Sequence, residues 1–175
     1  MACRAWREMG LRVGGCAAAL AFTACGLSES DSEPAPARST TCALDISLSG
    51  AASYEPATPD NLACASAVQT GPGMMLLFLP RESNAIKGVG ISTTEALPGE
   101  VGAGMNTQLS ATLADDSSAM AAGCQSELLE NTLLASDATG ASYLLRGTGS
   151  CTNQPPSSLL VNGNFAFTAT TVWTK

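Results

Sequence analysis

Three segments of the chain alternate between apolar and polar residues at every second position. They cover residues 42–49, 105–113 and 165–173. Successive side chains of a β-strand point to opposite faces, so a period of two predicts strands with one buried face. Cys42 would lie on the inner face of the first strand. The inner face of the last strand would hold Phe165, Phe167, Ala169, Thr171 and Trp173.

Two further runs predict strands, and one short segment predicts a helix. Residues 74–79 are six consecutive apolar residues, which is typical of a central strand covered on both faces. Residues 86–93 predict another strand, weakened by two glycines. Thr58 and Pro59 suit the N-cap and the first position of a helix, so we expect a short helix from there through Val68.

A turn divides the segment from residue 124 to residue 151 into two expected strands. Residues 124–135 and 141–151 flank the sequence Ser-Asp-Ala-Thr-Gly, which has the composition of a turn. The leucines of the first segment also fit one face of a helix. A hairpin accounts for both segments and the turn together, so we favour two antiparallel strands here.

A second hairpin is expected near the end of the chain. Asn162-Gly163 suits a type I′ turn between residues 159–161 and the strand that begins at Asn164. In all, the pattern predicts a mainly β protein of seven or eight short strands with a minor helix. An antiparallel β-sandwich and a small closed barrel both fit this pattern.

The first 24 residues have the parts of a secretory signal. Three arginines precede an apolar stretch, residues 13–24, that is too short to span a bilayer. The stretch ends in Phe22-Thr23-Ala24, directly before Cys25. This arrangement resembles the lipobox of bacterial lipoproteins, although that family prefers leucine where this chain has Phe22. The resemblance implies cleavage before Cys25 and attachment of a diacylglycerol to its sulfur.

The resemblance also implies a place in the cell. Gly26 follows the cysteine where inner-membrane lipoproteins carry Asp, so the resemblance implies the outer membrane. Three parts of the chain are then expected: a signal peptide, 1–24; a disordered tether rich in Ser, Pro and acidic residues, 25–40; and a single β-rich domain, 41–175. The membrane, reached through the lipid, is the expected partner.

Two alternatives to lipidation at Cys25 remain open. The chain could be an ordinary secreted protein cut after Ala21, which would leave Cys25 as a spare thiol. Cys16 is a second conceivable lipid site, and it is less favoured because the apolar stretch would then end before its centre. Each alternative still exports the domain.

The remaining cysteines predict two disulfides. Seven cysteines are encoded, and Cys42, Cys64, Cys124 and Cys151 follow the tether. Four cysteines in an exported domain allow three connectivities. We favour Cys42–Cys64 and Cys124–Cys151, because the midpoint of 124 and 151 falls inside the predicted turn and a hairpin would place that pair opposite each other. No C-x-x-C pair is present, so no metal is expected.

Charge and composition exclude several classes of function. Three of the eight basic residues and one of the fifteen acidic residues precede Cys25, which leaves a net charge of −9 from that residue onward. An acidic domain repels nucleic acid, so no nucleic-acid partner is expected. Histidine is absent, which excludes Ser-His-Asp and Cys-His catalysis and His-ligated zinc within this chain.

Few residues suggest chemistry. The glycine-rich stretch 99–104 lacks the lysine and the following helix of a phosphate loop, so we expect a hairpin loop. Asp115 and Asp116 could supply calcium ligands, but solvated loop acids are the better reading. Glu127 and Glu130 could form a carboxylate pair, although a spacing of three points them to opposite faces of a strand. Arg146 is expected to pair with one of these glutamates.

Three functions fit this reading, and none requires a cofactor. The first is a non-catalytic, lipid-anchored cell-envelope domain that acts in surface interaction or envelope structure. The second is a β-barrel carrier of a small apolar ligand. The third is a histidine-independent hydrolase that uses Glu127 and Glu130. We favour the first, and so expect no enzyme, because no catalytic constellation is visible. The expected lining of the carrier is Met74, Met75, Phe165, Phe167 and Trp173.

Overall fold

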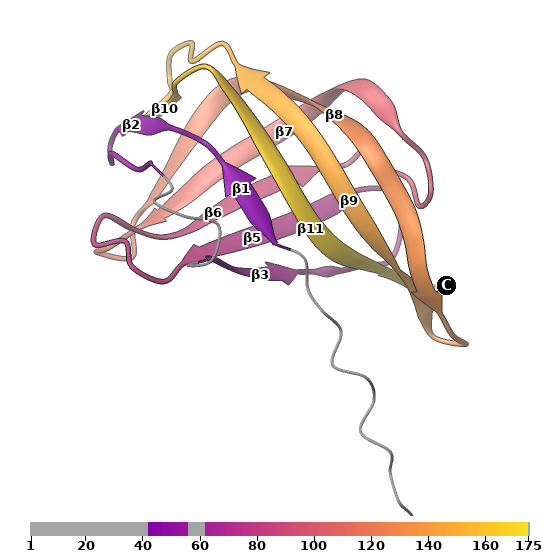
Figure 1. Cartoon of the computed structure of the whole chain (residues 1–175). Helices are drawn as coiled ribbons and strands as arrows, with labels where there is room; N and C mark the ends of the chain where they lie inside the picture. Colours follow the sequence, from indigo (N-terminus) through magenta and orange to yellow (C-terminus); the bar gives the residue numbers. More distant parts are fainter. Residues whose placement is uncertain (1–41, 56–61, 175) are drawn as a thin grey trace, which may run out of the picture. The chain divides into compact units, whose positions relative to one another are not determined.

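The computed structural model describes residues 42–55 and 62–174, and this part of the chain is all-β (Figure 1). No helix occurs within these two ranges. The strands are β1 (Ala43–Asp45), β2 (Leu48–Gly50), β3 (Leu62–Ser66), β4 (Val68–Gln69), β5 (Met74–Pro80), β6 (Ile86–Thr93), β7 (Gly102–Leu113), β8 (Ser118–Ser136), β9 (Gly140–Cys151), β10 (Leu159–Val161) and β11 (Asn164–Thr174).

Eight strands of one nine-stranded sheet curl into a nearly closed antiparallel barrel, and the ninth is the short β4. The strands lie in the order β1-β11-β9-β8-β7-β6-β5-β3, and β2 and β10 form a separate pair (Figure 1). Consecutive strands from β5 to β9 each pair with the next one along the chain. Of the two architectures expected, the small barrel is confirmed. The sandwich is wrong, because pairing continues around one sheet and does not divide it into two.

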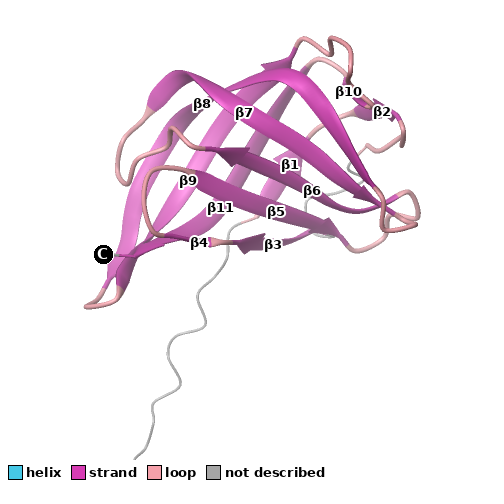
Figure 2. Cartoon of the chain, turned by 180° about the vertical axis from the view of Figure 1, so that it is seen from behind, coloured by secondary structure: helices cyan, strands magenta, loops and turns pink. Residues whose placement is uncertain are grey.

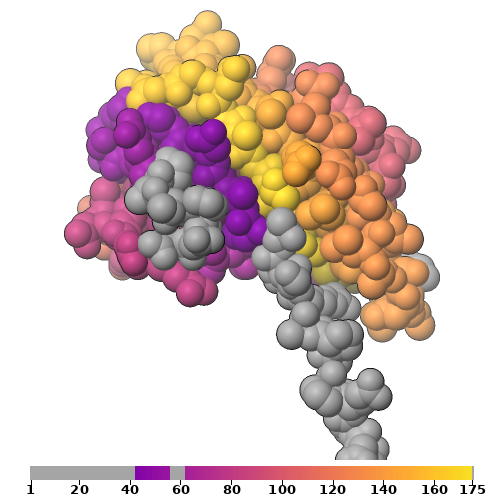
Figure 3. All heavy atoms as spheres, in the orientation of Figure 1, coloured from indigo at the N-terminus to yellow at the C-terminus, as the bar shows by residue number. Residues whose placement is uncertain are grey.

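The seam of the barrel is closed by short segments and a disulfide. β3 pairs with β5, and β4 follows one residue later and pairs in parallel with the end of β11 (Figure 2). β1 pairs with the same edge of β11 nearer its start, and Figure 3 shows these two strands side by side. The Cys42–Cys64 disulfide joins β1 to β3 across the gap that remains. This disulfide was expected and is confirmed.

The predicted short helix is wrong. Residues 56–61, which carry its capping signal, lie outside the described residues, but the segment that should complete the helix forms β3 and β4. Cys64 pairs with Phe78 of β5 and is bonded to Cys42. Partners distant in the sequence therefore overrode a local capping preference, as tertiary context often does.

The predicted hairpin at Asn162-Gly163 is also wrong. Gly163 has a φ of +80°, as a tight turn requires, but β10 pairs with β2 and not with β11. β11 instead lies between β9 and β1. A turn sequence specifies that the chain reverses, and it does not specify which strand becomes the neighbour.

The alternating segments place their apolar residues inside the barrel as predicted. Leu44, Ile46 and Leu48 are buried, and so are the alternate residues of β7 and β11. β5 differs from the prediction, because Met75 and Leu77 are exposed on the outer face of the barrel. The wall is therefore covered on its inner face only, and the run of six apolar residues does not mark a strand buried on both sides.

Two phenylalanines fill the barrel beside two glycines. Phe165 and Phe167 of β11 are fully buried and lie opposite Gly149 and Gly147 of β9. A Cβ at Gly147 would overlap the ring of Phe167 and come within 2.6 Å of the Glu127 carbonyl oxygen. The rings therefore occupy the space that side chains on β9 would need, an arrangement that pins the register of neighbouring strands.

β8 is the longest strand and carries irregularities that change its side-chain pattern. Its register shifts between Leu128 and Glu130 and again between Leu133 and Ala135. β8 also extends beyond β7, because its pairing with β7 ends at Leu128. The turn that joins β8 to β9 lies at the end of the barrel where β11 finishes (Figure 1). We call this end, formed by residues 94–101, 137–139 and Thr174, the C-terminal end of the barrel.

Candidate functional site

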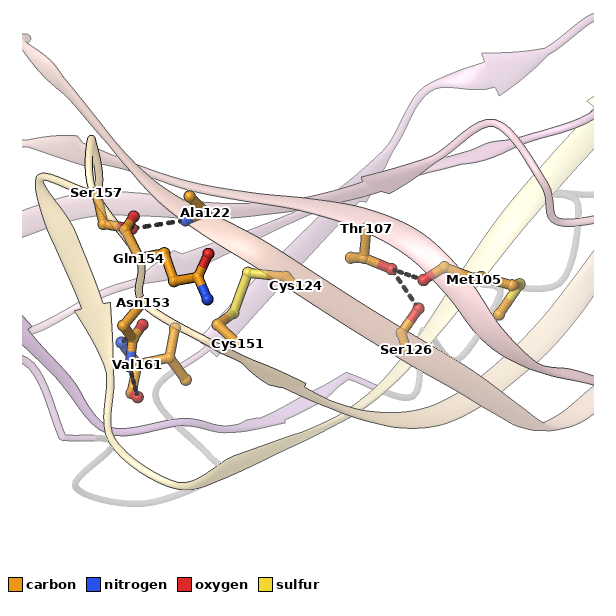
Figure 4. The surroundings of a disulfide bond; sticks show 10 residues. All are labelled: Met105, Thr107, Ala122, Cys124, Ser126, Cys151, Asn153, Gln154, Ser157 and Val161. Carbon is orange, nitrogen blue, oxygen red and sulfur yellow. Dashed lines mark hydrogen bonds between the residues drawn. A yellow bond between two sulfur atoms is a disulfide. The ribbon is translucent and has the colours of Figure 1, made fainter.

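The second disulfide lies inside the barrel and is confirmed. Cys124 and Cys151 are directly paired residues of β8 and β9, with a Cα–Cα distance of 3.9 Å (Figure 4). Nearby, the Thr107 hydroxyl donates to the Met105 carbonyl at 3.0 Å, which leaves the Ser126 hydroxyl as the donor to Thr107 at 2.5 Å. Cys124 and Thr107 also border a hollow of the barrel wall.

A hollow of about 680 Å³ borders strands β4 to β8. Two of the five expected carrier residues, Met74 and Met75, line it. The other lining residues are mostly small or polar, among them Thr93, Asn106 and Gln108. A pocket for an apolar ligand is usually lined by hydrophobic and aromatic side chains. The polar lining therefore gives the carrier hypothesis weak support.

The three aromatic residues expected in the carrier lining lie elsewhere. Phe165 and Phe167 fill the core against β9, as described above. Trp173 is buried, donates its indole N–H to the Gly73 carbonyl at 3.1 Å and packs edge-on against Tyr143, with ring centroids 5.2 Å apart. The structure therefore does not bring the five expected residues together around one cavity.

The adjacent acids Asp115 and Asp116 each have a protein partner. Asp115 accepts hydrogen bonds from the hydroxyl and the amide of Ser117, and these bonds hold the pKa of its carboxyl below the usual value. Asp116 accepts from the Lys87 ammonium at 2.6 Å. Across the described ranges, no group of three or more His, Cys, Asp or Glu residues is placed to hold a metal ion.

Glu127 and Glu130 share the outer face of β8, which corrects the expectation that they point to opposite faces. Glu127 pairs with Thr148, and Glu130 pairs with the outward-facing Arg146 because Leu129 is an extra residue between two paired positions. The bulge therefore cancels the effect of an odd spacing. The Arg146 guanidinium lies 4.0 Å from the Glu130 carboxylate, so the expected ion pair is present at the limit of contact. Whether the two acids perform hydrolysis stays a prediction.

Exposed apolar side chains gather at the C-terminal end of the barrel. We call this group the apolar end cluster, and its members are Leu97, Val101, Leu129, Leu133 and Leu134. Asn131, itself buried, fixes the loop to β8, because its amide N–H groups donate to the carbonyls of Leu97 and Glu100 at 2.7 and 2.8 Å. Gly102, next to Val101, pairs with Leu128. The loop and the leucines of β8 are therefore neighbours.

The sequence pattern did not single out this cluster. Two leucine doublets in β8 are the signal that could have revealed it. Neighbouring leucines of a strand point to opposite faces unless a bulge intervenes, so one leucine of each doublet is expected on the outer face. Exposed apolar groups of this kind mark interaction surfaces more often than scattered single residues do. The cluster is the clearest candidate site in the described part of the chain.

Other predicted features fall outside the ranges that the structure describes. Cys25, the signal peptide and the tether all precede residue 42. In residues 42–55 and 62–174, no helix is long and apolar enough to cross a bilayer. Comparison with protein-family models, with curated proteins and with solved structures finds no match for this chain.

Proposed function

We propose that this chain is a lipid-anchored cell-envelope protein whose barrel acts without catalysis, in surface interaction or envelope structure. The observation that carries the proposal is the run from the basic start of the chain to Phe22-Thr23-Ala24 and Cys25, which resembles a lipoprotein leader. The outer membrane is the proposed location, because Gly26 follows the cysteine.

Features of the barrel support export. The two disulfide bonds would be reduced in the cytoplasm, where thiols are kept free, so they favour a location outside it. Three of the four candidate acids, Asp115, Asp116 and Glu130, each contact a hydroxyl or a basic group. The apolar end cluster offers a surface for binding.

Replacing Cys25 with serine is expected to release the protein from the membrane. Serine cannot form the thioether to diacylglycerol, and no other acyl chain would then hold the domain. After separation of the producing cells into membrane and soluble fractions, the wild-type protein should sediment with membranes, and most of the Cys25→Ser protein should stay in the supernatant.

Cys16→Ser is the matched control, because it removes the other conceivable lipid site. It should leave the protein in the membrane fraction. Release by Cys16→Ser, or a wild-type protein whose mass includes no acyl chains, would reject lipidation at Cys25.

A carrier of a small apolar ligand is the second candidate. The hollow of about 680 Å³ beside Met74 and Met75 favours it, since its volume lies in the range of ligand sites. A carrier should retain a small molecule when the protein is weighed under native conditions and lose it on denaturation. The hollow is lined largely by polar and small residues, so we place this candidate after the first.

A further inference from the structure

The apolar end cluster is concentrated at one end of the barrel. Its five residues are more than half of the large apolar side chains that are exposed within the described ranges. Leu129, Leu133 and Leu134 each expose 52% of their surface, and Val101 exposes 63%. These residues lie around Asn131. Three are on the part of β8 that extends beyond β7, and two are in the loop whose carbonyl groups accept hydrogen bonds from Asn131.

The described chain begins with a strand whose N-terminal side faces the same end. β1 is antiparallel to β11, with Ala43 opposite Thr168 and Asp45 opposite Ala166. β11 finishes at the C-terminal end of the barrel, so the first residue of β1 is the one nearer that end. The six residue-to-residue steps from Thr168 to Thr174 span about 20 Å of strand.

The length of chain before β1 suits this direction. Seventeen residues separate Cys25 from Cys42, inclusive of Cys42, and a chain of that length reaches about 60 Å when fully extended. The end of the barrel, about 20 Å from Ala43 along β11, is therefore within the extended reach of a chain of this length.

Charge restricts the kind of lipid surface. Glu95 and Glu100 flank Leu97 in the loop, and Asp137 lies in the turn after β8. Of the described basic residues, Arg81 and Lys87 lie near the opposite end. Arg146 lies beside the cluster and pairs with Glu130, whose carboxylate is 4.0 Å from its guanidinium, so the acidic residues still outnumber the basic ones at this end. Anionic headgroups would be repelled, whereas zwitterionic headgroups carry no net charge.

We propose that the apolar end cluster docks on a zwitterionic phospholipid surface and holds the barrel end-on against the membrane that carries its lipid. This inference rests on the proposed lipid anchor for its biological setting. The anchor keeps the domain at millimolar effective concentration near the bilayer, so a weak contact suffices to set its orientation. The contact itself is a property of the barrel.

Vesicle flotation of the full chain carrying Cys25→Ser tests the docking without the anchor. Phosphatidylcholine vesicles, raised to millimolar lipid, should carry the protein to the top of a density gradient. Adding Leu133→Ser and Leu134→Ser should weaken this partitioning about tenfold, because two half-exposed leucines leave the contact. Both side chains are exposed, so the fold should tolerate the change.

Met120→Ser is the matched control, because Met120 lies on the outer face of the same strand near the opposite end and is 44% exposed. It should leave flotation unchanged. Replacing half of the phosphatidylcholine with phosphatidylglycerol should weaken flotation of the parent protein.

Three outcomes would overturn the proposal. They are no flotation at millimolar lipid, equal flotation of the parent and the double-leucine protein, and a dimer in solution that the same two substitutions dissociate. The last result would assign the cluster to contact between copies. The lipid anchor is judged separately by the intact mass of the protein from its native membrane, which includes acyl chains only if the chain is lipidated, so the two proposals fail independently.

Discussion

Replacing Gly147 with alanine is expected to lower the free energy of unfolding by about 3 kcal/mol. The new methyl group would overlap the ring of Phe167 and lie 2.6 Å from the Glu127 carbonyl oxygen. Neither neighbour has room to move, because Phe167 is fully buried and Glu127 belongs to the paired strand β8. Chemical denaturation with urea, followed by tryptophan fluorescence or circular dichroism, measures the loss.

Gly102→Ala is the control for this substitution. An added Cβ at Gly102 meets nothing within 4 Å, so alanine there should leave stability unchanged or raise it by less than about 1 kcal/mol. Combining Gly147→Ala with Phe167→Ala should cost less than the sum of the single changes, because the methyl group enters space that the ring vacates. Equal stability of Gly147→Ala and the wild type would mean that Phe167 does not lie across β9.

Removing the Cys42–Cys64 disulfide, by changing both cysteines to alanine, is expected to cost about 3 kcal/mol. The bond closes a loop with a sequence separation of 22, and the chain-entropy model gives this magnitude. It also joins β1 to β3 at the seam, where the barrel has no continuous strand pairing. Hydrogen exchange should therefore quicken first in β1, β3 and β4.

Removing the Cys124–Cys151 disulfide provides the comparison. Its sequence separation of 27 predicts a similar cost in the same model. These cysteines lie within the paired β8–β9 hairpin, so the seam should stay protected from exchange. If both double variants exchanged in the same regions, the seam would not depend on the Cys42–Cys64 bond.

The faces of the strands could be predicted from the sequence because burial has a period of two. Leu44, Ile46, Phe165, Phe167 and Trp173 all lie inside, as their alternate positions indicated. The rule uses only the neighbours of each residue along one strand, and those are fixed by the backbone. It fails where an extra residue enters a strand, which is why Glu127 and Glu130 share a face.

The closure of the barrel could not be predicted, because it depends on partners far apart in the chain. β3 was expected to be helical, and it instead fills the gap beside β5. Residues 159–161 were expected to pair with the following strand, and they pair with β2, more than a hundred residues earlier. Local propensity and turn chemistry do not contain this information.

The candidate site was predicted in part. The cysteine pairs followed from an even count and from the symmetry of a hairpin about its turn, and both pairs are confirmed. The apolar end cluster was missed, because Leu129, Leu133 and Leu134 looked like core residues of a strand or a helix. They are left uncovered by the different lengths of β7 and β8, together with the register shifts at Leu129 and Leu134.

The intact mass of the protein purified from its native membrane tests the central claim most directly. The account predicts a chain that begins at Cys25, carries acyl chains and lacks the four hydrogens lost in forming two disulfides. A small molecule retained under native conditions and lost on denaturation would favour the carrier. A soluble chain without lipid would contradict the account and leave a secreted disulfide-bonded barrel.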